Sequence, residues 1–254
     1  MKRAVLRLSL ALGMLAAAVT TASAANIKLL TTGAYRPVVQ DILPNFEKQS
    51  GHKVTVVSDT AGALIRRLRS GEAFDVIVLT SDGLDALADI GTVSADSITP
   101  LARVGIGVAV PLSAPQPNLY SVEAFRQTLL GARRIAYMDP NTGSTSGNAI
   151  VAIFQTMGIS SEVAKKTVLV RMGPAADAVA RGDADIALQQ ASEIKLVPSV
   201  RFAGLIPAQV QVYTTYTGAI SAATQQQDAA TALLSALSDP GNEAILKRRG
   251  LEAP

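Results

Sequence analysis

The regular alternation of short apolar runs with amphipathic segments constrains the fold of this chain more than any other feature. Short apolar runs occupy positions 26–30, 53–57 and 75–80, and the third is nearly continuous in β-branched residues. Each is followed by apolar residues at helical spacing, over 37–49, 63–69 and 84–90. Strands that alternate with helices form parallel sheets, because the chain must cross over between neighbouring strands. The pattern therefore predicts an α/β fold with helices on both faces of the sheet.

A long extended run divides this alternation into two units. The run covers 101–111, after which helices are predicted over 122–130, 148–157 and 175–181 and strands over 135–138, 167–170 and 186–189. A second strand-rich segment, 210–221, precedes terminal helices over 228–237 and 242–249. Two mixed, mainly parallel sheets joined by two crossing segments predict two lobes with a cleft between them. We expect lobe I to comprise 25–104 and 205–254, and lobe II to comprise 105–204.

The first 24 residues have the order of a secretory signal peptide. Lys2, Arg3 and Arg7 precede an apolar stretch over 8–18, and three small residues end at Ala24. The apolar stretch is roughly 11 residues long, short of the ~20 that a membrane-spanning helix needs. We expect cleavage after Ala24, location in the periplasm, and a mature chain of 230 of the 254 residues. The three cations equal the whole net charge of +3, so charge gives no argument for a nucleic-acid partner.

Composition excludes several classes of site. The chain has no cysteine and one histidine, His52, which rules out disulfides and the usual zinc ligand sets. His52 stands in a polar turn, where we expect it to be exposed. The loop 143–147 lacks the lysine of a Walker loop, and the sequence offers no Ser-His-Asp set. We expect neither a metal nor a cofactor.

The loop 139–147 is the strongest local sign of a ligand site. It contains two glycines and four hydroxyl side chains between a predicted strand and a predicted helix. A strand, a glycine-rich turn and a helix N-terminus direct backbone N–H groups and hydroxyls toward one point, which suits an anion. The alternative is an ordinary loop with an N-cap, because serine and threonine are common caps.

Polar residues at the other strand ends extend this candidate site. In open α/β sheets, ligands bind outside the carboxyl ends of the strands, and here hydroxyls, glycines, amides and arginines occupy those positions. The candidate ligand-binding residues are Thr31, Thr32, Gly33, Ala34, Tyr35, Arg36, Thr60, Ala61, Gly62, Arg66, Ser81, Gly143, Ser144, Thr145, Ser146 and Gln189. Neutral donors and helix N-termini of this kind suit a small anionic solute.

Two arginines among these candidates bear on the identity of the anion. Arginine pairs bidentately with carboxylates, whereas a dehydrated tetrahedral oxyanion is often held by neutral dipoles. Arg36 begins a predicted helix, where the dipole disfavours a cation, so a nearby ligand anion would remove the conflict. Arg66 lies one turn from Gly62 and could face either the cleft or the solvent.

Four stretches resemble the periplasmic solute-binding proteins of ABC importers, in the branch that includes molybdate-binding proteins. They are residues 39–54, 62–76, 179–186 and 239–251, which span most of the mature chain. The resemblance implies a type II periplasmic binding protein fold whose lobes close on a solute at the hinge. It also implies ABC importer membrane subunits as partners, and we expect a monomer.

The resemblance is less direct at the ligand. Molybdate-type members hold their oxyanion with two serines and a tyrosine. The matching positions here are Ala34, then Ala61 or Thr60, and Gln189. The missing hydroxyls favour a di- or tricarboxylate over molybdate, and both classes of anion stay open.

The same branch also includes an enzyme, periplasmic aconitate isomerase, which shifts a proton within a tricarboxylate. An enzyme of this type is the alternative to a binding protein. It would need arginines that hold carboxylates and one acid/base group. Tyr35, Asp59 and Asp82 are the candidates, although both aspartates also suit the role of helix caps. Binding without catalysis is the favoured interpretation.

Overall fold

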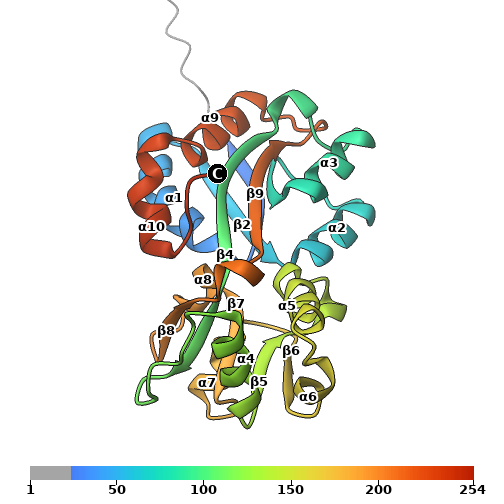
Figure 1. The fold of residues 1–254 in the computed structure, drawn as a ribbon. Helices are drawn as coiled ribbons and strands as arrows, with labels where there is room; N and C mark the ends of the chain where they lie inside the picture. The colour runs from blue at the N-terminus through green and yellow to red at the C-terminus, as the bar shows by residue number, and fades with distance from the viewer. Residues whose placement is uncertain (1–23) are drawn as a thin grey trace, which may run out of the picture.

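The computed structural model describes residues 24–254, which form two α/β lobes, one above the other in Figure 1. The predicted signal peptide lies outside the described residues. The strands are β1 (Asn26–Thr32), β2 (Lys53–Asp59), β3 (Val76–Thr80), β4 (Thr99–Pro111), β5 (Ile135–Met138), β6 (Thr167–Val170), β7 (Ile186–Gln190), β8 (Val200–Leu205) and β9 (Tyr213–Ile220). The longer helices are α1 (Arg36–Ser50), α2 (Ala61–Arg69), α3 (Ser81–Asp89), α4 (Val122–Gly131), α5 (Thr145–Thr156), α9 (Gln227–Leu237) and α10 (Glu243–Arg249). The short ones are α6 (Ser160–Ala164), α7 (Ala176–Ala180) and α8 (Ala191–Ile194).

The first lobe is built on the strand order β2-β1-β3-β9, to which β4 is added. β1 pairs in parallel with β2 and β3, and β9 runs antiparallel to β3. Both faces of this sheet are buried. Ile27 and Leu29 face a core formed with α1, α9 and α10, whereas Leu30 and Ile77 face a core formed with α2 and α3. This two-sided burial explains the nearly continuous apolar character of these strands.

The second lobe is built on β4, β7, β5 and β6 in that order, and β8 pairs with β4 on the other side. β5 pairs in parallel with β6 and β7, whereas β4 runs antiparallel to β7 and β8. One core contains α4 and α5 with side chains such as Ile106, Phe125 and Ile150. The other contains α7 and α8 with Ala187 and Ile194.

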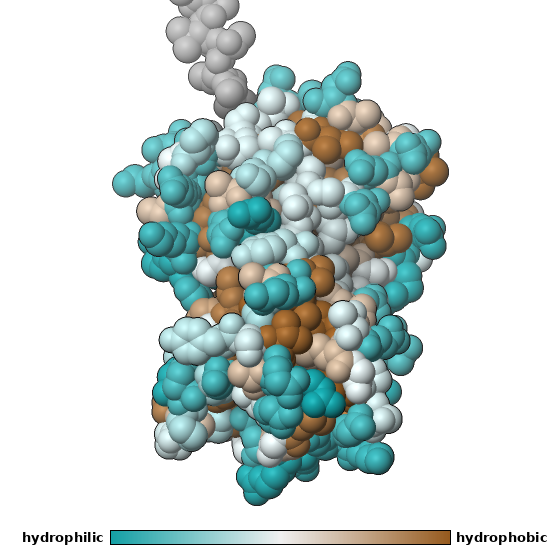
Figure 2. Space-filling view, in the orientation of Figure 1, coloured by the Kyte–Doolittle hydropathy of each residue, from teal (hydrophilic) through white to brown (hydrophobic). Residues whose placement is uncertain are grey.

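A single strand belongs to both lobes. β4 pairs with β9 up to Gly105 and with β7 from Ile106 onward. β4 is thus the first crossing segment, and the second follows β8. The side chain of Gln211, in the second segment, forms hydrogen bonds with the main chain of Ile106 in β4. Gln211 Oε1 accepts from Ile106 N at 2.8 Å, and its Nε2 donates to Ile106 O at 2.9 Å. Side chains fill the waist between the lobes, several of them apolar (Figure 2).

One expectation from the sequence needs correction. His52 is buried rather than exposed, because its Nδ1 accepts a hydrogen bond from Ala25 N at 3.1 Å and its ring lies 6.1 Å from that of Phe46. Pro44 lies inside α1, which nevertheless runs without interruption over fifteen residues. Pro44 and Gln40 are both exposed, so water can bind the carbonyl that the proline leaves without a donor.

None of the helices within 24–254 has the length and apolar character needed to cross a bilayer.

Candidate functional site

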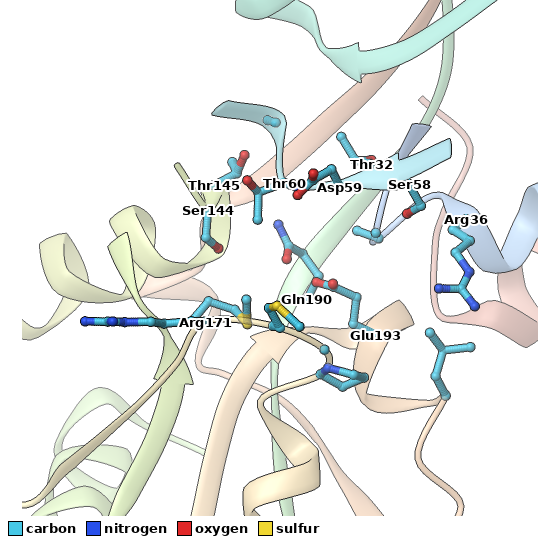
Figure 3. A pocket seen from close by; sticks show the side chains of 18 of the residues that line it. Thr32, Arg36, Ser58, Asp59, Thr60, Ser144, Thr145, Arg171, Gln190 and Glu193 are labelled. Atoms are coloured by element: carbon cyan, nitrogen blue, oxygen red, sulfur yellow. The ribbon is translucent and has the colours of Figure 1, made fainter. Parts of the chain in front are cut away.

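A cavity of about 370 Å³ lies between the two lobes (Figure 3). Its lining is contributed by loops that follow β1, β2, β6 and β7, by the start of α5, and by β9. The lining residues are Thr32, Gly33, Ala34, Arg36, Ser58, Asp59, Thr60, Ala61, Met138, Ser144, Thr145, Arg171, Met172, Gly173, Pro174, Gln190, Glu193, Leu196 and Tyr216. The carboxyl ends of the parallel strands in both lobes therefore meet at one space.

The register of β1 and β2 builds the wall from the first lobe. Thr32 and Asp59 are partners at the last position of this parallel pair, so the two following loops leave the sheet side by side. The second loop begins α2, and Thr60 caps this helix by accepting a hydrogen bond from Ala63 N at 3.2 Å. The wall thus combines hydroxyls with a helix N-terminus.

The loop 139–147 builds the opposite wall. Asp139 accepts hydrogen bonds from Asn141 N and Arg171 Nε, which hold the pKa of its carboxyl below the ordinary value. The chain then turns at Gly143, with φ of 79°, and Ser144 caps α5 by accepting from Gly147 N at 3.1 Å. An α-helix leaves its first N–H groups without intrahelical partners, and this twelve-residue helix begins at the cavity.

The two walls touch at one edge of the cavity, and we call this the glycine contact. Gly62 N donates to Gly143 O at 3.1 Å, while Thr60 Oγ1 and Arg66 Nη2 donate to Thr142 O at 2.8 and 3.2 Å. The backbones are so close that a Cβ on Gly62 would stand 2.7 Å from Gly143 Cα. Only glycines permit this approach of the lobes.

The floor of the cavity carries an acid that has no ion-pair partner among residues 24–254. Glu193, on α8, points its carboxyl into the cavity (Figure 3). Burial raises the pKa of this carboxyl to about 7, and the nearby Gln189 amide offsets part of the rise without a hydrogen bond of normal geometry. Tyr216 lies beside it and accepts from Gln190 Nε2 at 3.3 Å. Burial raises the pKa of this phenol as well, so the phenol stays neutral.

Two arginines line the cavity, and they differ in how free their charges are. Arg36 is exposed, lies at one side of the cavity, and forms no ion pair with any carboxylate of residues 24–254 (Figure 3). Arg171 lies at the opposite side and points away toward Asp139, with a distance of 3.1 Å from Nε to Oδ2. Arg36 is therefore the cation that an incoming anion can use.

Half of the residues predicted as ligand-binding line the cavity. They are Thr32, Gly33, Ala34, Arg36, Thr60, Ala61, Ser144 and Thr145. Gly62, Arg66 and Gly143 form the glycine contact instead.

The other predicted residues lie behind the walls. Thr31 and Ser146 are buried, Ser81 pairs with Thr217 at 2.8 Å, and Gln189 Oε1 accepts from Ala175 N at 2.6 Å. These residues support the walls rather than line the cavity.

Of the three acid/base candidates, only Asp59 lines the cavity. Tyr35 is fully buried, and its hydroxyl donates to Leu237 O at 3.3 Å. Asp82 lies in the first turn of α3 and does not line the cavity.

Besides Asp59, a second acid, Glu193, faces the cavity, and the sequence pattern does not single it out. Glu193 follows β7 by only three residues, on a helix of four residues that shows no periodic pattern. Its position after a buried strand was the available signal, since the neighbouring Gln189 was selected on that basis. Tyr216 lies within β9 rather than just after a strand, so a search of the residues that follow strands does not select it. Arg171 follows β6 directly and satisfies the same rule that selected Arg36.

The described part of the chain, 24–254, contains no group of three metal-binding side chains of the His, Cys, Asp and Glu types.

A comparison with known families decides the membership of this two-lobed chain. The profile of the family described as bacterial extracellular solute-binding protein matches residues 27–252. The chain belongs to this family.

Individual relatives of this solute-binding protein differ in what they act on. An aconitate isomerase from Pseudomonas sp. is 33% identical over 253 residues, which cover 96% of this chain and 95% of that protein. The periplasmic molybdate-binding protein of Azotobacter vinelandii superposes with a TM-score of 0.76 at 21% identity, over 90% of this chain and 99% of the other. The sulfate-binding protein SubI of Mycobacterium tuberculosis H37Rv superposes with a TM-score of 0.70 at 17% identity, over 90% and 87%. The two structures share the fold.

Proposed function

We propose that this solute-binding protein captures a small di- or tricarboxylate in its interlobe cavity and delivers it to the membrane subunits of an ABC importer. The observation that carries the proposal is Arg36, a cation on the cavity wall that no protein carboxylate neutralises. The N-terminus of α5 lies on the other wall, so two carboxylate arms could each meet a positive group from a different lobe. In this proposal the protein works in the periplasm after loss of residues 1–24.

The size of the cavity favours a polycarboxylate over a tetrahedral oxyanion. A tetrahedral oxyanion has five heavy atoms. At about 30 Å³ for each, the volume of one water molecule, they fill less than half of the cavity. A four-oxygen anion would thus leave most of the 370 Å³ empty. The positions that match the hydroxyls of molybdate-type members are Ala34, then Ala61 or Thr60, and Gln189, whose Oε1 accepts from Ala175 N.

Calorimetric titration of the mature protein tests this proposal. We expect propane-1,2,3-tricarboxylate or trans-aconitate to bind, and Arg36→Ala to weaken binding tenfold or more. Lys48→Ala, on the same helix but away from the cavity, is the matched control and should bind as the wild type does. Binding of molybdate or sulfate without binding of any carboxylate would refute it.

A second candidate function, isomerisation of a tricarboxylate, is favoured by Glu193. A carboxyl with pKa of about 7 is suited to both accept and return a proton near neutral pH. In an allylic proton shift, Glu193 would remove a proton from the methylene carbon next to the double bond. The C–H electrons would form the new double bond, and the old double bond would accept the proton at its far carbon. Nothing is oxidised or reduced. The aconitate isomerase relative supports this candidate.

Proton NMR separates the two candidates. If the protein is an isomerase, trans-aconitate incubated with it gives a new vinyl signal, and in D₂O the product gains deuterium. Glu193→Gln should abolish this conversion while binding persists. A wild-type protein that binds trans-aconitate and leaves its spectrum unchanged is a binding protein only.

A further inference from the structure

We infer that Glu193 couples capture of the anion to uptake of a proton, because its half-buried carboxyl and the bound carboxylate share one hydrogen. The inference rests on the proposed function, since it concerns a carboxylate in the same cavity. Glu193 is then a specificity-determining residue, because its carboxyl favours ligands whose carboxylate can form a hydrogen bond with it.

The Glu193 carboxyl lies between the lobes. Glu193 extends from α8 to the loop after β1, where its Oε1 lies 2.8 Å from the place that a Cβ on Gly33 would occupy. Gly33 therefore leaves room for the acid. The carboxyl points into the space where the ligand would lie (Figure 3).

The charged groups on the elements next to Glu193 determine whether its carboxyl can stay ionised. Arg36 lies across the cavity on α1, whereas Asp59, at the end of β2, is paired with Arg67 at 3.8 Å from Oδ2 to Nη1. Arg171, after β6, is turned toward Asp139. On the helix side, Lys195 points away over the Phe202 ring, 5.5 Å from its centroid.

Tyr216, on β9, completes these surroundings as a neutral group. Within residues 24–254 no cation forms an ion pair with Glu193, so its ionised form lacks that stabilisation, and the charge of Arg36 is left for the ligand. If Glu193 were ionised, it would face a ligand carboxylate in a poorly solvated space, and two like charges sharing one site cannot both persist. One of the two carboxyl groups must hold a proton.

Burial favours a proton on Glu193 rather than on the ligand. Burial already raises the pKa of Glu193 to about 7, so about half of the free protein holds this proton at pH 7. A bound anion raises the pKa further. Capture should therefore take up about half a proton at pH 7 and nearly one at pH 8. Thr32 Oγ1 is buried on the cavity wall and has no hydrogen-bond partner within residues 24–254, so its hydroxyl is available to the ligand.

Calorimetry in buffers of different ionisation enthalpy measures this uptake directly. Trans-aconitate and propane-1,2,3-tricarboxylate are titrated at pH 6, 7 and 8, and the slope of the observed enthalpy against buffer enthalpy gives the protons taken up. For the wild type we expect the uptake to rise with pH, and the Kd to weaken toward a tenfold change per pH unit above pH 7. The carboxyls of both probes are mainly ionised at pH 7 and 8, so the ligand contributes little to the change.

Two variants identify the group that takes up the proton. Glu193→Gln keeps a hydrogen-bond donor without a titratable proton, so its Kd should be nearly constant from pH 7 to 8 and its uptake near zero. Glu123→Gln, which removes an exposed carboxyl on α4, is the matched control and should keep the wild-type uptake.

The outcomes separate the inference from the proposed function. Wild-type binding without proton uptake at pH 8 overturns the inference and leaves the proposed function intact, and the measurement needs no variant. The same holds if Glu193→Gln retains the full uptake. If neither probe binds either protein at any pH, the proposed function is wrong and the inference falls with it.

Discussion

Replacement of Glu193 by glutamine should change the pH dependence of stability of the ligand-free protein. The folded protein holds the Glu193 proton up to a pH of about 7, whereas the unfolded chain releases it near 4.5. The folded state thus binds more protons than the unfolded state between these values, so the contribution of this group to stability falls as pH rises through that window. The contribution is complete below pH 4.5 and lost above pH 7.

The size of this effect follows from the difference between the two pKa values. At 1.36 kcal/mol for each pKa unit, a rise from 4.5 to about 7 corresponds to about 3 kcal/mol. Glutamine has nearly the same shape and does not ionise. We therefore expect Glu193→Gln to be up to about 3 kcal/mol more stable than the wild type at pH 8, and to differ little from it at pH 5.

Urea unfolding of both proteins at half-unit steps from pH 5 to 8.5 measures this difference. Other carboxyls, such as Asp41 beside Arg249, have lowered pKa values and give the opposite trend with pH. They act equally in both proteins, so the difference in free energy of unfolding isolates Glu193. A difference that is the same at pH 5 and pH 8 would refute the argument that burial keeps this carboxyl neutral.

Two further perturbations test the walls of the cavity. Gly62→Ala places a Cβ 2.7 Å from Gly143 Cα, so it should hold the lobes apart and weaken carboxylate binding about tenfold, with a larger radius of gyration by small-angle scattering in the presence of ligand. Gly131→Ala, at a helix end with open space around it, should change neither quantity. Arg171→Ala should weaken binding far less than Arg36→Ala in the same titration, because its guanidinium is paired and 80% exposed; equal losses would show that both arginines bind the ligand.

The sequence predicts the order of elements well because their signals are local. The apolar runs over 135–138 and 167–170 correspond to β5 and β6 without any shift of boundary. β8 was not predicted, since its only partner is β4, about a hundred residues earlier, and pairing of that kind leaves no periodic trace in one sequence. The placement of one lobe relative to the other likewise depends on contacts between residues far apart in the sequence, which a local pattern does not show.

The same reasoning explains which parts of the candidate site were found. The rule of strand ends identified the loops after β1 and β2 and the start of α5, because these positions depend only on where an element ends. The rule does not say which side chain of a loop turns inward. Tyr35 therefore entered the acid/base candidates although it packs 6.3 Å from the ring of Tyr216, on the side away from the cavity. Glu193 required knowledge that a short helix crosses the floor.

The amide of Gln211 has a mechanical consequence for the closing of the lobes. By binding both the N–H and the C=O of Ile106, it joins the two crossing segments as a neighbouring strand would. Two crossings tied at the same level cannot bend independently, so the lobes should rotate about one axis rather than twist or slide. A single spin-label distance between the lobes would then describe the whole motion, with each population of distances corresponding to one angle of opening.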